Sequence, residues 1–231
     1  GPVQKRKGVS PSVPVYEYDG TFYAGADSWP NSRFRVTSTV GHMWSLDFTK
    51  AVNDNQALDP IELYTAPTVH LEDPRPRMTE HLQAEATGCH VLVLWLDCDR
   101  EGENICFEVL KVLPEFSADR IWRASFSAVT ELEVHRALQR LVKPNACEAA
   151  AVDARQELDL KVGCSFTRLL TRALRDAARR KFGLSKLRLI SYGPCQTPTL
   201  FFCVERQREI DAFVPKQFWE LCVTVAVGAR D

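Results

Sequence analysis

The chain has 231 residues, of which 45% are hydrophobic and 26% charged, and this composition supplies enough apolar side chains for a folded core. No apolar run approaches the roughly 18–20 residues of a membrane-spanning helix, and the polar, basic first ten residues do not form a secretory signal. The net charge of −1 conceals an asymmetry, because residues 97–103 hold four acids and one base whereas residues 168–188 hold eight bases and one acid.

Eight cysteines are present, and none belongs to a Cys-x-x-Cys pair. Most lie in apolar runs such as LWLDCD and LFFCVE, which is typical of buried free thiols in a reducing, intracellular compartment. The five histidines are scattered and no local ligand spacing fits zinc, so we expect no zinc site.

In chain order, residues 15–25 and 34–40 are predicted strands, with a turn at 27–31. The first ten residues are expected to contain no strand. The Asp- and Pro-rich stretch 53–76 is typical of a loop or a short helical excursion, and residues 77–87 are predicted to form a helix.

Residues 90–97, HVLVLWLD, form a continuous apolar run that is typical of a strand buried on both faces of a parallel sheet. A helix over 103–112 and a strand over 121–127 follow. Thr130 and Glu133 form a capping box that predicts a helix to about residue 142. This order of strands and helices indicates an α/β domain.

After Pro144 the chain is rich in Ala, Leu, Arg and Glu, which predicts one or two helices over 145–182, with a break near Gly163. Another helix is expected over 194–213 and a strand over 218–227. The predicted domains are an α/β domain at 1–129, a mainly helical domain at 130–212, and the first strand of a further β domain at 213–231.

Asp97, Asp99 and Glu101 stand at the carboxyl end of the predicted buried strand, where ligands bind in open α/β sheets. Three carboxylates this close repel one another unless a cation binds them, and a few hard oxygen ligands suit Mg²⁺. The alternative is that the acids only favour a helix N-terminus through the helix dipole.

Four arginines are spaced by 4, 3 and 4 residues and so share one face of a predicted helix: Arg168, Arg172, Arg175 and Arg179. A basic stripe of this kind suits a phosphate backbone, although a merely solvated helix surface remains the alternative. Farther on, Gly193-Pro194 predicts a helix start whose free N–H groups could meet an anion. Ser191 and Gln196 can hydrogen-bond phosphate or sugar there, unless this is an ordinary capped helix start.

Five motifs resemble those of the type IA DNA topoisomerases. They are the Toprim pattern D-x-D-x-E-G-E (97–103), TSTVGHMWSLDF (37–48), RASFSAVT (123–130), VDARQELDLKVGCSFTR (152–168) and SYGPCQTPTL (191–200). Pro194-Cys195 replaces the Arg-Val that is commoner in the family, a departure similar to the topoisomerase III beta branch. The resemblance implies a Toprim (Rossmann-like) α/β domain, then a mainly helical DNA-binding domain, then the start of a β arch.

The resemblance also implies the site residues and their ligands. Asp97, Asp99 and Glu101 would hold Mg²⁺, or Mn²⁺, near the scissile phosphate. The DNA contacts expected from the resemblance and from the basic stripe are Arg155, Arg168, Arg172, Ser191, Gly193 and Gln196. A further metal-binding glutamate is expected on a first Toprim strand that precedes residue 1.

The family cleaves one strand with a tyrosine that is followed by Arg-Thr, a pattern absent from this sequence. No nucleophile is therefore assigned here, and the chain alone is expected not to relax DNA. Expected partners are single-stranded or negatively supercoiled DNA, RNA and a Tudor-domain scaffold protein, with no membrane and a nuclear location. The alternatives are a nucleic-acid-binding module without strand passage, or another Toprim phosphotransferase such as a primase or nuclease.

Overall fold

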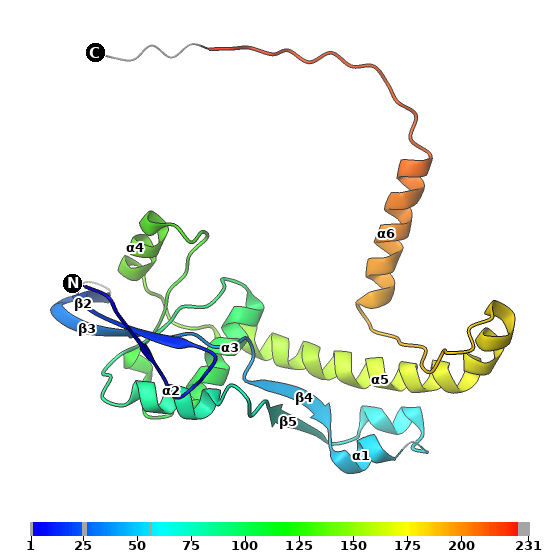
Figure 1. The fold of residues 1–231 in the computed structure, drawn as a ribbon, viewed down its shortest axis with the longest axis horizontal. Coiled ribbons are helices and arrows are strands. Elements are labelled where there is room, and N and C mark those ends of the chain that lie inside the picture. Colours follow the sequence, from blue (N-terminus) through cyan, green and yellow to red (C-terminus); the bar gives the residue numbers. More distant parts are fainter. Residues whose placement is uncertain (1, 25–26, 56, 226–231) are drawn as a thin grey trace.

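The computed structural model describes residues 2–24, 27–55 and 57–225. Strands and short helices gather in an α/β part, from which the long helix α5 (Ala146–Phe182) projects (Figure 1). Helix α6 (Gln196–Asp211) rises steeply from the region beside α5. The chain thus has an α/β portion followed by a helical one, as the sequence predicted.

The first sheet is an antiparallel hairpin of β2 (Pro14–Ala24) and β3 (Asp27–Val36), with β1 (Gln4–Lys7) along the edge of β2. Two expectations were wrong: the first ten residues do contain a strand, and 27–31 belongs to β3 rather than to a turn. Charge explains the missed strand, because the Arg6 guanidinium of β1 lies 2.7 Å from the Glu17 carboxylate of β2. Ion pairs between strands therefore fix a segment that has no apolar alternation.

Aromatic pairs across β2 and β3 extend that hairpin beyond the predicted length. Tyr18 stacks on its partner Phe34 with ring centroids 4.9 Å apart, and Phe22 stacks on Trp29 at 5.5 Å. Such pairs stabilise a sheet beyond the area they bury, and they hold the strand through the Trp-Pro-Asn stretch that resembles a turn in sequence.

A second antiparallel pair consists of β4 (Trp44–Phe48) and β5 (Thr68–Glu72). Between them lie helix α1 (Lys50–Asp54) and the 3-10 helix η1 (Pro60–Tyr64). The sequence predicted the helical excursion but missed both strands. For β5 the reason is that most of its side chains are exposed, so the strand lacks an alternating apolar pattern.

The parallel pair of β6 (Leu92–Leu94) and β7 (Ile121–Arg123) forms the centre of the α/β part. Leu92 and Leu94 pack into a core with α2 (Met78–Ala86) and α3 (Arg100–Val112), whereas Val93 packs on the opposite side with the β2–β3 hairpin. Burial on both faces was expected from the continuous apolar run and is confirmed, although the hydrogen-bonded strand is shorter than predicted.

The helical portion begins with α4 (Glu131–Gln139), which the Thr130 side chain caps by accepting a hydrogen bond from the Glu133 N–H. A 3-10 turn, η2 (Ala118–Arg120), precedes β7. Helix α5 is continuous, so the break expected near Gly163 was wrong. One helical glycine costs only about 1 kcal/mol, and the packed helix tolerates it.

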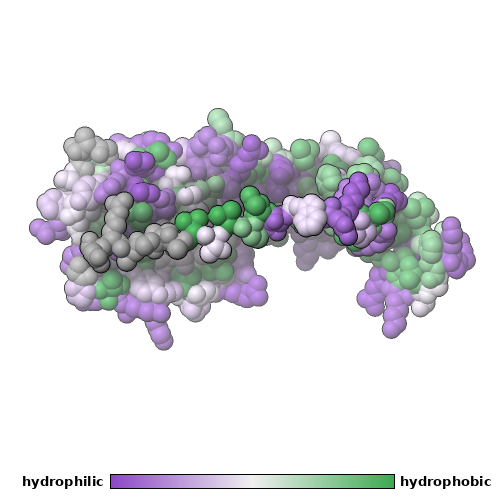
Figure 2. Space-filling model, turned by 90° about the horizontal axis from the view of Figure 1, so that it is seen from above, coloured by the Kyte–Doolittle hydropathy of each residue, from purple (hydrophilic) through white to green (hydrophobic). Residues whose placement is uncertain are grey.

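The end of the described chain is extended rather than folded. Residues 218–225 form no strand, and 226–227, the end of the strand that the sequence predicted, lie outside the described residues. Hydrophobic side chains along this extension are exposed, as Figure 2 shows, and Trp219 is 99% exposed. No helix among the described residues is long and apolar enough to cross a membrane.

All eight cysteines are free thiols, as predicted, but the expectation that most are buried was wrong. Only Cys106 is fully buried, and Cys89 and Cys164 are partly covered. The remaining five are exposed. Two of them, Cys203 and Cys222, are exposed because their apolar runs lie on α6 and on the extension, which make few contacts within the described chain.

Candidate metal and single-strand site

The acidic stretch forms a tight turn between β6 and α3. Asp99 is the N-cap of α3, and its Oδ1 accepts a hydrogen bond of 2.8 Å from the Gly102 N–H. A Cβ at position 102 would lie 2.0 Å from the Asp97 carbonyl oxygen, so only glycine fits there. The Gly of D-x-D-x-E-G-E is therefore required by the close approach of the helix to the turn.

A buried ion pair holds this turn from behind. The Nε of Arg123 lies 2.9 Å from the Glu103 carboxylate, and the two side chains are only 5% and 9% exposed. The same guanidinium donates hydrogen bonds to the carbonyl oxygens of Leu96, at 2.8 Å, and Asp97, at 2.6 Å. Because the carbonyls at the end of β6 are fixed by one rigid planar group, the backbone of the acidic turn is preorganised.

Sequence reasoning overlooked both partners of this ion pair. Glu103 was grouped with the other acids by motif, but it points into the interior, where its second oxygen accepts a hydrogen bond from the Asn145 N–H. Arg123 was noted only within RASFSAVT. The available signal was a lone arginine on an otherwise apolar strand, since a buried charge must be paired.

The three predicted metal ligands differ in their surroundings. Asp97 and Asp99 are exposed, and the Oδ1 of Asp99 is the helix cap described above. Glu101 lies between two positively charged or ionisable partners: its Oε1 is 2.7 Å from Arg155, and its Oε2 is 3.2 Å from the Nε2 of His42. Glu101 is therefore already engaged, whereas Asp97 and Asp99 face solvent.

His42 links the acidic turn to the connection between β3 and β4. Its Nδ1 is 3.2 Å from the Glu108 carboxylate, whose other oxygen accepts a hydrogen bond of 2.8 Å from the Met43 N–H. Glu108 is buried and anchors this contact on α3. The histidine was set aside in the sequence as one of five scattered residues, and only the fold brings it to Glu101.

The donor set suits a hard divalent cation, because three carboxylates stand within five residues at the carboxyl end of β6. However, no group of three or more His, Cys, Asp or Glu side chains in the described part of the chain is arranged as a metal-ligand set. In this structure the two oxygens of Glu101 contact Arg155 and His42.

Helix α5 contacts the acidic turn directly. Besides its contact with Glu101, Arg155 lies 3.9 Å from Asp159 one turn along the same helix. Asn104 of α3 donates hydrogen bonds to the Ala149 carbonyl, at 3.0 Å, and to the Asp153 carboxylate, at 2.7 Å. These contacts dock α5 on α3 and place the predicted DNA-binding residue Arg155 beside the predicted metal ligands.

The arginine stripe of α5 is largely engaged with backbone. Arg168 donates to the carbonyls of residues 52 and 55, at 3.3 and 3.1 Å, and Arg172 donates to the carbonyl of Leu58 at 2.9 Å. Arg179 donates to the Leu187 carbonyl at 2.7 Å. The stripe therefore holds the α1–η1 segment and the chain after α5, which sequence spacing alone did not indicate.

The segment before α6 runs along α5. Thr171 accepts a hydrogen bond of 2.9 Å from the Ile190 N–H, and Thr167 accepts one of 2.9 Å from the Tyr192 N–H. Ser191, between them, is exposed. Gly193 and Gln196 are in contact, because the Gln196 N–H donates a hydrogen bond of 3.0 Å to the Gly193 carbonyl. Three predicted strand contacts, Ser191, Gly193 and Gln196, thus lie together before and at the start of α6.

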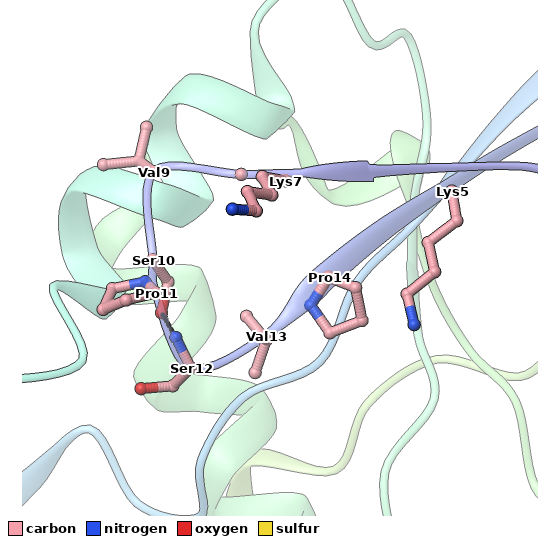
Figure 3. A pocket seen from close by; sticks show the side chains of 9 residues that line it. Lys5, Lys7, Val9, Ser10, Pro11, Ser12, Val13 and Pro14 are labelled. Atoms are coloured by element: carbon pink, nitrogen blue, oxygen red, sulfur yellow. Dashed lines mark hydrogen bonds between the residues drawn. The ribbon is translucent and has the colours of Figure 1, made fainter.

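Two of the hollows on the described surface are lined in part by charged residues. One, of about 180 Å³, adjoins the acidic turn and is lined by Cys98, Asp99, Glu103, Arg123, Ser125, Val142, Lys143, Asn145 and Glu148. The other, of about 470 Å³, lies at the connection from β1 to β2 and contains Lys5, Lys7 and Ser10 among its lining residues (Figure 3). Only the first is placed to contribute to chemistry at the acidic turn.

Comparison with known proteins agrees with this geometry. Residues 18–129 match the Toprim domain family and residues 143–230 match a family described as DNA topoisomerase. A DNA topoisomerase 3-beta of Oryza sativa subsp. japonica is 48% identical over 225 residues, which are 96% of this chain and 25% of that protein. The chain belongs to the type IA DNA topoisomerase family.

Other relatives support the same family membership. Human DNA topoisomerase 3-beta-1 is 45% identical over 229 residues, covering 96% of the chain and 26% of that protein. The structure of full-length topoisomerase I from Thermotoga maritima has a TM-score of 0.50 and 25% identity, covering 78% of this chain and 27% of that one. The chain spans about a quarter of the length of the curated relatives that it matches.

Proposed function

We propose that this chain is the metal-binding and strand-gripping portion of an enzyme that cleaves, passes and reseals single DNA strands to relax negative supercoils. The observation that carries the proposal is the ion pair between Glu101 and Arg155, at 2.7 Å, which joins the acidic turn to the helix that carries the strand-contact residues. Family membership supports the same reading. The proposed domains are Toprim at 1–129, a helical domain at 130–212 and the beginning of an arch at 213–231.

The metal part of the proposal assigns Mg²⁺, or Mn²⁺, to Asp97, Asp99 and Glu101. A bound divalent cation would supply positive charge to a phosphate oxygen during strand cleavage. Asp97 and Asp99 are exposed and would hold such an ion, and Glu101 would join them if it gave up its contact with Arg155 or His42. Arg123 positions the backbone of the turn for both states.

The strand part assigns phosphate or sugar contacts on and beside α5. Arg155 lies beside the acidic turn, and the predicted contacts are Arg155, Arg168, Arg172, Ser191, Gly193 and Gln196. Arg168 uses two N–H donors on backbone carbonyls, and a guanidinium has five, so donors remain for phosphate. A backbone grip of this kind binds without reading base sequence.

Chemically, the family resemblance implies a 5′-phosphotyrosine intermediate, which conserves the phosphodiester energy and so requires no ATP. We assign the nucleophile to none of the five tyrosines of this sequence. The resemblance extends the proposal to a nuclear location, to RNA as a second substrate and to a Tudor-domain scaffold protein as a partner.

A second candidate is a nucleic-acid-binding module without catalysis. It is favoured by one observation: both oxygens of Glu101 are engaged by protein groups. Another Toprim phosphotransferase is disfavoured, because residues 143–230 match the topoisomerase family outside the Toprim domain.

Binding of oligonucleotides by the chain tests the strand grip. We expect fluorescence anisotropy to show tighter binding to a single strand than to a duplex of equal length, with little dependence on base sequence. The logarithm of the binding constant should fall linearly with the logarithm of the salt concentration, with a slope of about −0.7 for each phosphate contacted. A preference for the duplex, or no binding at low salt, would contradict the proposed grip.

A further inference from the structure

An aromatic pair lies beside the proposed strand contacts Ser191 and Gly193. The rings of Phe166, on α5, and Tyr192, in the segment before α6, have centroids 5.0 Å apart and are tilted by 39°. Phe166 is 38% exposed and Tyr192 is half-buried. Nothing in the proposed metal site or in the phosphate contacts uses these rings.

The pair is held rigidly by backbone contacts. Thr167, the neighbour of Phe166, accepts a hydrogen bond of 2.9 Å from the Tyr192 N–H. The same hydroxyl donates a hydrogen bond of 3.3 Å to the Tyr192 carbonyl, so both polar backbone groups of Tyr192 are tied to α5. The rings are therefore ordered before any ligand arrives, which reduces the entropy lost on binding.

Helix geometry aligns the pair with the acidic turn. Phe166 follows Arg155 by eleven residues, which is close to three full turns, so both residues leave α5 on nearly the same face. The rise along the axis is about 16 Å. A strand whose phosphate meets Arg155 would reach the aromatic pair within a few nucleotides, inside the roughly 4–16 nucleotides that single-strand-binding folds cover.

The polar and basic residues around the aromatic pair indicate which kind of ligand binds there. Ser191 precedes Tyr192, and Gln196 begins α6 four residues later, so polar groups suited to sugar and phosphate flank the rings. Residues 168–188, which follow Phe166, carry eight bases and one acid. Aromatic rings beside positive charge are the arrangement by which proteins hold unpaired bases without reading sequence, since every base has a π face.

We propose that Phe166 and Tyr192 form a stacking platform for an unpaired base of the bound single strand. This inference rests on the single-strand grip proposed above and adds a base contact to a phosphate contact. It identifies the ligand of this face as a nucleobase rather than an apolar protein surface.

The experiment combines two variants of the chain with abasic oligonucleotides. Phe166→Leu/Tyr192→Leu should weaken single-strand binding about tenfold, within the roughly 5- to 150-fold that one stacked base contributes. The control Phe182→Leu, which removes an exposed aromatic from the end of α5, should stay within about twofold of the unmodified chain. The slope of affinity against salt should be unchanged, because no phosphate contact is removed.

An abasic scan supplies the second measurement and needs no altered protein. Removing one base at a time should weaken binding by the unmodified chain at one or two positions, and at those positions the double leucine variant should show no further loss. A flat scan, or equal affinity of the double variant, would overturn the platform. If the variant does not fold, the scan alone decides. Absence of all single-strand binding overturns the strand grip itself, whereas salt-dependent binding with a flat scan overturns only the platform.

Discussion

The double substitution Arg168→Ala/Arg172→Ala separates two roles of the arginine stripe. Both side chains hold the α1–η1 segment through hydrogen bonds to carbonyls, and both are proposed to contact phosphate. The matched control is Arg168→Lys/Arg172→Lys, which keeps the two charges but loses the planar fork of N–H donors.

Each role has its own magnitude. The alanine variant loses the three hydrogen bonds to carbonyls of the α1–η1 segment. Each contributes about 1 kcal/mol net, so the unfolding free energy should fall by roughly 2–3 kcal/mol through these bonds. Because Arg172 is exposed, we expect a loss of unfolding free energy at the lower end of this range. If both guanidiniums touch phosphate on a single strand, the log–log salt slope should flatten by about 1.4.

The assays are urea unfolding and oligonucleotide anisotropy over a salt series. We expect the alanine variant to lose stability and slope together, and the lysine variant to lose stability while it keeps most of the slope. An unchanged slope in the alanine variant would refute the phosphate role and leave the pair as a clamp for the α1–η1 segment. The strand grip would then rest on Arg155 and the residues around Gln196.

Three further outcomes are expected. Asp97→Asn/Asp99→Asn should remove the heat of Mg²⁺ binding in calorimetry, and equal affinity in both chains would exclude these ligands. Arg123→Ala leaves Glu103 buried without its partner and should lower the unfolding free energy by about 3–5 kcal/mol in urea; a loss below about 1 kcal/mol would show that the pair does not hold the turn. Burial raises the pKa of the Cys106 thiol to about 12, so this thiol should react with a disulfide reagent only after unfolding, and its fast labelling in the native chain would contradict the core packing.

The sequence predicted the parts of the fold that depend on apolar periodicity and capping. The apolar run before Asp97 indicated a strand covered on both faces, and Thr130 marked the start of α4. It missed β1, whose position depends on ion pairs with Glu17 and Glu85 from distant parts of the chain. Charged strands give no periodic signal, because their partners are known only once the fold is formed.

The candidate site was likewise predicted from the sequence only in part. The motif indicated where the carboxylates lie, since a turn after a buried strand fixes their place in the sheet. It could not show that Glu101 contacts His42, 59 positions earlier, and Arg155, on another helix. Likewise, spacing put Arg168 and Arg172 near one face of α5 but could not show that the α1–η1 segment packs there.

The most direct test of the account is strand passage by a chimaera in which this chain replaces the matched 225 residues of the rice relative. We predict that the chimaera relaxes negatively supercoiled plasmid in Mg²⁺ without ATP. The same chimaera with Asp97→Asn/Asp99→Asn should bind single strands but relax no plasmid. Relaxation that survives the two substitutions, or a folded, strand-binding chimaera that relaxes nothing, would contradict the claim that this chain supplies the metal site and strand grip of a topoisomerase.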